Sequence, residues 1–218
     1  MRYKVATRFA VQGDLRFISH HDSMRLFERA LSRAQLPVKF SEGFNPRPKL
    51  SLPLPRAVGV ASDVELLVVE FDQAVEPAEV MQKLGEQMPE GLTLIEAEPM
   101  PESRAPQPEL VEYQLPLTPE WMTPVAEMVE RLVASPTWMV GRENARGRIE
   151  KEIDLRAYLH EAAIEGQTLR WTVRVTNSGT LRPAEMLAAL GLNPEEWHHR
   201  IRRTAVQWSI ARPAEAAV

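Results

Sequence analysis

The sequence EPMPESRAPQPE, at residues 98–109, carries four prolines and few apolar side chains. Proline fixes φ and removes a backbone hydrogen-bond donor, so this stretch favours an extended connection over a helix or a central strand. We therefore predict a Pro-rich linker at residues 99–109. It divides the chain into an N-terminal domain at residues 1–98 and a C-terminal domain at residues 110–212, followed by a tail at residues 213–218.

Hydrophobic periodicity predicts a similar order of elements on both sides of the linker. Before it, the expected elements are a strand at residues 2–11, a helix from His20 that ends before Pro37, extended segments at 38–41 and 49–54, a strand at 64–71, a helix at 76–88 and a strand at 92–96. After it, they are strands at 111–117, 138–141, 149–159, 168–176 and 201–210, and helices at 119–134 and 183–190. This order is typical of the split βαβ arrangement. We expect an α+β fold of two tandem ferredoxin-like (split βαβ) units.

The chain contains no cysteine, which excludes disulfides, thiol nucleophiles, zinc ribbons and cysteine-held iron–sulfur clusters. No apolar run approaches the roughly 18 residues that a membrane-spanning helix needs. The N-terminal residues alternate as in a strand and lack the apolar stretch of a secretory signal, so we expect a cytoplasmic protein with no membrane contact. The sequence lacks the common phosphate, dinucleotide, zinc-protease and serine-hydrolase motifs, and we expect no cofactor and no metal site.

The net charge of −4 conceals a strong asymmetry. Residues 1–56 carry eleven Lys or Arg against four Asp or Glu, residues 57–135 carry three against sixteen, and residues 136–218 carry twelve against ten. A basic first quarter in an acidic protein favours a local anionic partner. The alternative is that the acidic residues simply solubilise the middle of the chain.

The first predicted helix combines an N-terminal capping pattern with a row of arginines. Ser19, followed three residues later by Asp22, resembles a capping box. At about 100° per residue, Asp22, Arg25 and Arg29 share one face, and Arg33 extends the row. Arginine suits phosphate because its planar guanidinium offers a fork of donors, although a solvated arginine row is also common.

A stiffened loop with the sequence GFNPRPK occupies residues 43–49. Its glycine permits positive φ, and its two prolines restrict the chain. An exposed Phe44 could stack on an unpaired base while Arg47 and Lys49, with Asn45 beside them, hold the neighbouring phosphate. The alternative is that Phe44 fills the core beneath the loop and the prolines only shape a turn.

His20 and Asp22 are the candidate catalytic residues. A His–Asp pair at the start of a helix suits acid–base chemistry or metal binding. The alternative is that His20 only forms hydrogen bonds near the helix cap.

The stretch from Arg16 to Ser51 reads R-F-x-S-H-x-D-x-x-R, then R-A-x-x-R-A-x-L-P, then S-x-G-F-N-P-x-P-K-x-S. It resembles the radical SAM-linked protein family, a domain found beside or fused to B12-binding radical SAM proteins and fused to some ribonuclease E/G-type proteins. The resemblance implies a partner of one of these two kinds. In the family pattern the residue between the two loop prolines is usually histidine, whereas here it is Arg47, which would serve a phosphate contact.

We expect an RNA-binding accessory protein that presents tRNA or rRNA to a partner enzyme, either a radical SAM enzyme or a ribonuclease E/G-type protein. The expected nucleic-acid-binding residues are Arg16, Arg25, Arg29, Arg33, Phe44, Asn45, Arg47 and Lys49. Two alternatives remain open. One is an RNA-processing or RNA-modifying enzyme that uses His20 and Asp22, and the other is a protein-docking subunit with no nucleic-acid contact.

Overall fold

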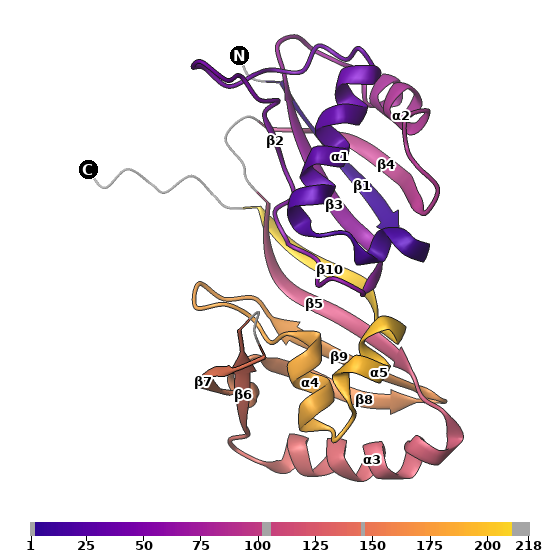
Figure 1. Cartoon of the computed structure of the whole chain (residues 1–218), viewed down its shortest axis with the longest axis vertical. Coiled ribbons are helices and arrows are strands. Elements are labelled where there is room, and N and C mark those ends of the chain that lie inside the picture. The colour runs from indigo at the N-terminus through magenta and orange to yellow at the C-terminus, as the bar shows by residue number, and fades with distance from the viewer. Residues whose placement is uncertain (1–2, 102–105, 145–146, 211–218) are drawn as a thin grey trace, which may run out of the picture. The chain divides into compact units, whose positions relative to one another are not determined.

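Figure 1 shows the computed structural model, which describes residues 3–101, 106–144 and 147–210. Contacts within the chain divide it into two compact units. The first contains Met1–Val58, Ser62–Gln107 and Trp208–Val218, and the second contains Gly59–Ala61 and Pro108–Gln207. The predicted tail at residues 213–218 and the linker residues 102–105 lie outside the described residues.

The first unit is an antiparallel sheet with two helices. Its elements are β1 (Tyr3–Val11), a 3-10 helix (Gly13–Phe17), α1 (His20–Arg33), β2 (Leu50–Ser51), β3 (Ala61–Phe71), α2 (Pro77–Gly85) and β4 (Leu92–Met100). The strand order is β4-β1-β3, and β2 pairs with β3. The β1–β3, β1–β4 and β2–β3 pairs are all antiparallel. In Figure 1, α1 and α2 lie against the same face of this sheet.

Helix α1 follows from a local cap and an apolar stripe. Ser19 Oγ accepts a hydrogen bond from the Asp22 N–H at 3.1 Å and donates one to Asp22 Oδ2 at 2.7 Å, which confirms the predicted cap. Phe27 and Leu31 are buried beneath the helix. Phe27 contacts Phe9 of β1 edge to face, with the ring centroids 4.9 Å apart.

Both faces of this sheet bury apolar side chains. Val5 and Val69 belong to the larger cluster, together with the buried residues of α1 and α2. Their neighbours Ala6 and Val68 belong to a smaller cluster with Leu66. Because successive residues of a strand point to opposite faces, the smaller cluster lies on the face that points away from α1.

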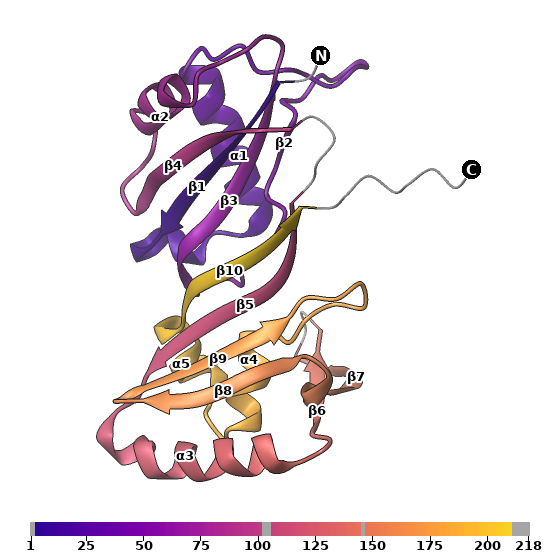
Figure 2. The same ribbon diagram turned by 180° about the vertical axis from the view of Figure 1, so that it is seen from behind.

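The second unit is also an antiparallel sheet with helices. Its elements are β5 (Pro106–Pro116), α3 (Pro119–Ala134), β6 (Met139–Glu143), β7 (Ile149–Asp154), β8 (Leu159–Glu165), β9 (Thr168–Arg174), α4 (Pro183–Ala189), α5 (Pro194–Trp197) and β10 (Arg202–Ile210). Its strand order is β10-β5-β9-β8, with β6 and β7 as a separate hairpin (Figure 2). The chain is thus an α+β protein. None of the helices in the described residues is long and apolar enough to span a membrane.

Two predicted strands of the first unit are much shorter than expected. Residues 38–41 form only isolated bridges, to Phe71 and to Pro48. Of residues 49–54, only the two residues of β2 pair with β3. A proline has no N–H donor, so Pro53 weakens any continuation of that ladder.

The predicted strand at residues 149–159 is two strands, β7 and β8. A 3-10 turn at Leu155–Ala157 separates them. The Asp154 side chain accepts a hydrogen bond from the Arg156 N–H at 3.0 Å and so caps this turn. Aspartate commonly stabilises turns in this way, and here the turn contains neither glycine nor proline.

The proline stretch at residues 99–109 is strand at both of its ends. β4 continues to Met100, and β5 begins at Pro106. Proline is tolerated on an edge strand and at the first position of a strand, and β4 lies at the edge of its sheet.

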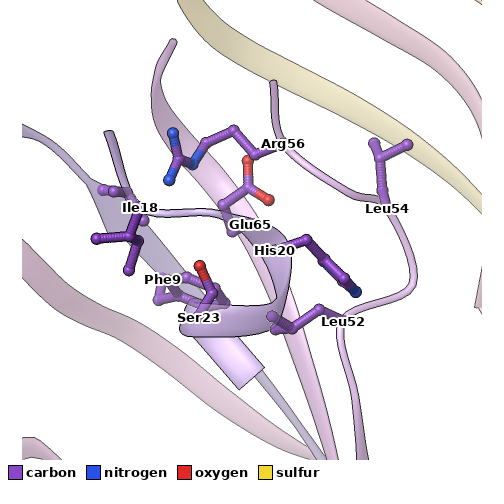
Figure 3. Close-up of a pocket in the computed structure, with 9 residues that line it drawn as sticks. Phe9, Ile18, His20, Ser23, Leu52, Leu54, Arg56 and Glu65 are labelled. Carbon is purple, nitrogen blue, oxygen red and sulfur yellow. The ribbon is translucent and has the colours of Figure 1, made fainter. Parts of the chain in front are cut away.

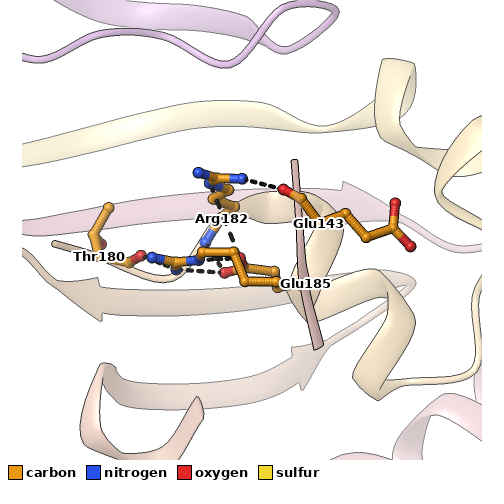
Figure 4. Close-up of polar contacts among 5 residues, drawn as sticks. Glu143, Thr180, Arg182 and Glu185 are labelled. Carbon is orange, nitrogen blue, oxygen red and sulfur yellow. Dashed lines mark hydrogen bonds and ion pairs between the residues drawn. The ribbon is translucent and has the colours of Figure 1, made fainter. Parts of the chain in front are cut away.

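A buried ion pair joins β6 to α4 in the second unit (Figure 4). Arg142 Nε lies 2.6 Å from Glu185 Oε1, and Arg142 Nη2 lies 2.9 Å from Glu185 Oε2. The same Nη2 donates to the Thr180 carbonyl at 2.7 Å. Glu185 also accepts a hydrogen bond from the Arg182 N–H at 2.8 Å, so one carboxylate both pairs with the hairpin and caps the helix. The two ion-paired side chains are only 9% and 6% exposed.

We predict that Glu185→Ala destabilises the protein by about 3–5 kcal/mol, because it leaves the Arg142 guanidinium buried without its counter-charge. The double variant Arg142→Met with Glu185→Leu is expected to lose less, since neither charge is then buried alone. Urea unfolding followed by tryptophan fluorescence measures these losses. Glu79→Ala, which breaks the exposed Lys83–Glu79 pair, is the control and should cost about 0.3–0.5 kcal/mol. Equal losses in Glu185→Ala and Glu79→Ala would contradict the assignment.

Candidate functional site

Residues 41–47 form a closed loop, which we call the Phe44 loop. At its base the Ser41 N–H donates to the Arg47 carbonyl at 2.8 Å, and the Arg47 N–H donates to Ser41 Oγ at 3.0 Å. Just outside it, the Lys49 N–H donates to the Lys39 carbonyl at 2.7 Å. The loop is therefore shaped by its own backbone and by the Ser41 hydroxyl.

Phe44 projects from this loop into solvent. Its side chain is fully exposed, at 106% of the reference value, so the interpretation of Phe44 as a core residue is wrong. Gly43 precedes it with φ of 122°, a conformation that glycine adopts at no steric cost. Asn45 and Arg47 are exposed as well. The loop thus presents an aromatic ring, an amide, a guanidinium and the Glu42 carboxylate close together.

Two arginines of the α1 row, Arg29 and Arg33, line a groove of about 550 Å³, which we call the α1 groove. Arg29 and Arg33 lie there with Asp22, Glu86 and Gln87. Arg33 is engaged, because its Nε donates to Gln87 Oε1 at 3.0 Å and its Nη2 donates to the Gln87 carbonyl at 3.1 Å. Two carboxylates share this groove with two arginines, so it has no excess of positive charge to attract phosphate.

The other predicted nucleic-acid-binding residues lie elsewhere in the first unit. Arg25 pairs with Asp22 on the exposed surface of α1, with Nη1 and Oδ1 3.6 Å apart. The Arg16 guanidinium lies 4.9 Å from the ring centroid of the phenylalanine that follows it. Lys49 lines a hollow with Val68, on the sheet face that points away from α1. The eight predicted nucleic-acid-binding residues therefore do not form one continuous surface.

His20 lines a pocket of about 20 Å³ at the start of α1, which is room for one water molecule. Figure 3 shows His20 and Ser23 from α1, Glu65 from β3, and Arg56 from the segment after β2 around this pocket. Apolar side chains complete the wall: Phe9, Val11, Ile18, Leu52 and Leu54. Glu65 is only 7% exposed. Asp22 does not line this pocket but the groove that contains Arg29 and Arg33. The carboxylate that shares the pocket with His20 is that of Glu65.

The sequence prediction omits Glu65 and Arg56. A signal for Glu65 exists, because a charged residue interrupts the apolar run at residues 64–71, and buried carboxylates are rare without a role. Arg56 follows a proline-rich segment without any distinctive pattern. Its Nη1 donates to the Arg16 carbonyl at 2.6 Å and its Nη2 to the Leu15 carbonyl at 3.2 Å, which fastens the turn before α1.

The environment favours a neutral His20 and an ionised Asp22. Burial lowers the pKa of His20, the charge of His21 lowers it further, and the Glu65 carboxylate opposes both effects. A hydrogen bond from the Ser19 hydroxyl lowers the pKa of Asp22. Near neutral pH, the His20 imidazole is therefore able to accept a proton.

Fold and site together define a class: an α+β protein with an exposed aromatic and basic loop and a small histidine pocket. Within the described part of the chain, no group of three or more His, Asp or Glu side chains is placed to hold a metal ion. The chain belongs to a bacterial family described as "Uncharacterized protein conserved in bacteria" (DUF2344), whose model matches residues 4–183.

Comparison with other proteins adds little beyond the family. No curated protein matches the chain. A crystal structure of an unknown protein from Galdieria sulphuraria matches 97% of this chain and 100% of its own, with 14% identity and a TM-score of 0.28. A similarity at this level carries no argument about fold or function.

We predict that the His20 pKa lies below its ordinary value of 6.5 in the folded protein. Glu65→Gln should lower this pKa further, since the carboxylate stabilises the imidazolium. His21→Gln should raise it, since a neighbouring positive charge is removed. An NMR titration of the imidazole carbon-bound protons measures both shifts, with the His20 signal assigned from His20→Gln.

The same shift sets a pH dependence of stability. Because the folded pKa is lowered, the unfolded chain binds this proton first as the pH falls below 6.5. The contribution of His20 to the free energy of unfolding is therefore complete above pH 6.5 and is lost as the pH falls from 6.5 to the folded pKa. A folded pKa above 6.5, or shifts of the same sign in both variants, would contradict this account of the pocket.

Proposed function

We propose that this protein is an RNA-binding accessory protein that holds an unpaired base on Phe44 and the adjoining phosphate with Arg47. The observation that carries the proposal is the complete exposure of Phe44 at the tip of a loop closed by its own hydrogen bonds. A large apolar ring in water loses the free energy that burial provides, about 25 cal/mol per Å². An aromatic ring held in this position suits a partner that covers it.

The chemistry of the Phe44 loop matches a single strand better than a duplex. Stacking requires an unstacked base with a free face, which single strands, loops and bulges supply. Arg47 adds a planar fork of donors that fits phosphate oxygens, and its side chain is exposed. Asn45 adds amide groups that can hydrogen-bond to a base edge.

The charge distribution supports the same partner. Residues 1–56 have seven more basic than acidic residues in a chain whose net charge is −4. A local basic segment in an acidic protein attracts an anion to one place, because charge elsewhere repels it. We therefore propose local contact with RNA in the cytoplasm and not general affinity for polyanions.

The accessory role rests on the resemblance of residues 16–51 to the radical SAM-linked proteins. We propose that the chain presents tRNA or rRNA to a radical SAM enzyme or to a ribonuclease E/G-type protein. The strand orders support the architecture that goes with this proposal. The order expected of a ferredoxin-like unit is found in β4-β1-β3, with β2 on β3, and again in β10-β5-β9-β8. We therefore propose two such units in tandem.

The proposal predicts that Phe44→Ala weakens binding of single-stranded RNA by about 1–3 kcal/mol, which is the value of one base stacked on an aromatic ring. Arg47→Ala should weaken binding and lower the slope of log K against log salt by about 0.7, the share of one phosphate on a single strand. Fluorescence anisotropy with labelled RNAs of about 12 nucleotides, across a salt series, measures both effects.

Two exposed positions provide matched controls. Ile95→Ala removes an exposed apolar side chain of β4, and Arg131→Ala removes an exposed arginine of α3. Both should leave the affinity for RNA unchanged. RNA binding that is as strong in Phe44→Ala as in Ile95→Ala, or that is equal for duplex and single strand, would overturn the proposal.

The His20 pocket favours a second candidate function, an RNA-processing or RNA-modifying enzyme. Its support is the placement of a neutral imidazole beside the buried Glu65 carboxylate, where a histidine can act as a general base. Asp22 would then contribute only by accepting a hydrogen bond from Ser19, the residue that caps the helix carrying His20. Loss of RNA turnover in His20→Gln, with affinity retained, distinguishes this candidate from the binding protein.

A further inference from the structure

Strand β8 leaves one edge of the second unit's sheet open. It ends the strand order β10-β5-β9-β8, so β9 is its only strand neighbour among the described residues. Natural proteins usually guard such an edge with charged side chains, proline, a β-bulge or a covering segment. The ends of β8 have such guards, Glu161 and Glu165 and a register shift between Leu159 and Glu161, but its central residues, at positions 162–164, are Ala-Ala-Ile and have none. An unguarded edge offers backbone donors and acceptors to an added strand.

A groove of about 580 Å³ runs between this edge strand and α3. The α3 side is lined by Ala126, Val129, Val133 and Ala134, with the Glu130 carboxylate among them, and the β8 side by Ala162, Ala163 and Ile164. Val133 is 44% exposed, although it is a large apolar side chain. The open edge and the apolar groove therefore lie next to each other, which is the arrangement that strand addition uses.

The two faces of β8 differ in chemistry. Ala162 and Ile164 pair with the buried Trp171 and Leu169, so they lie on the face toward the core and the groove. Ala163 and Glu165 lie on the opposite face. Arg170 of β9 is the cross-strand neighbour of Ala163, and it forms an ion pair with Glu165. An added strand would thus meet apolar side chains on one face and acidic ones on the other.

We propose that the edge of β8 and the α3–β8 groove bind an extended segment of a partner protein whose residues alternate between apolar and basic. Its apolar residues would enter the groove beside Val133, and its basic residues would lie opposite Glu161 and Glu165. Cross-strand pairs of opposite charge stabilise a sheet, and like charges placed opposite each other destabilise it. A second copy of this chain is disfavoured for that reason, because antiparallel pairing of two β8 strands brings their glutamates together.

A peptide of about six residues that alternates valine and lysine is the probe for this surface. Anisotropy of the labelled peptide with the full chain measures affinity, and hydrogen exchange of the amides at residues 162–164 locates the contact. We expect binding with slower exchange of these amides. Val133→Glu should weaken binding at least about tenfold, because it places a charge in the apolar groove. Glu161→Lys should weaken it about threefold, because it reverses one cross-strand pair.

Two controls decide the outcome. Ile149→Glu adds the same charge at an exposed position of β7 and should leave the affinity unchanged. A peptide of the same composition, with its valines and lysines in two blocks, should bind at least about tenfold more weakly, because it cannot match the two faces of β8. No binding, equal binding of the two peptides, or unchanged exchange at residues 162–164 would overturn the proposal. A dimer of this chain that dissociates in Val133→Glu would assign the surface to a second copy and would also overturn it.

Discussion

The edge-to-face contact between Phe27 and Phe9 holds α1 on the sheet of the first unit, and the His20 pocket and the groove of Arg29 and Arg33 depend on it. Both rings are buried, at 1% and 3% exposure. Such an aromatic pair contributes about 0.5–1.5 kcal/mol beyond its buried area, and it also fixes the rotation of the helix about its axis. That rotation turns His20 toward Glu65, and it turns Asp22 into a different groove.

The His20 pocket and the Phe44 loop of the first unit differ in burial and in polarity. The His20 pocket is small and mostly apolar, so burial lowers the pKa of His20, and the pocket has room for only about one water molecule. The Phe44 loop is the opposite case, since its ring and its guanidinium are both in solvent and its shape is set by backbone hydrogen bonds. A preformed loop loses little conformational freedom when a ligand covers it, which favours binding. The loop therefore suits recognition, and the pocket suits proton transfer.

The sequence predicted features that depend on neighbouring residues. The cap by Ser19, the amphipathic helix α1 and most strands follow from local spacing, and these predictions are confirmed. Features that depend on contacts between residues far apart in the sequence could not be predicted from local patterns. Glu65 meets His20 only because β3 lies beneath the start of α1, and the exposure of Phe44 depends on how residues 41–47 close on themselves. The division between β7 and β8 was missed because Asp154 shapes a turn that has no glycine or proline.

The central claim, that Phe44 stacks on an unpaired base, is tested most directly by fluorine NMR. Protein labelled with 4-fluorophenylalanine has six reporter positions, one for each phenylalanine. The signal of Phe44, assigned from Phe44→Leu, should shift on addition of single-stranded RNA, because a stacked base changes the magnetic environment of the ring. The signals of the buried Phe9, Phe27 and Phe71 should stay in place. RNA that binds while the Phe44 signal remains unchanged would contradict the account.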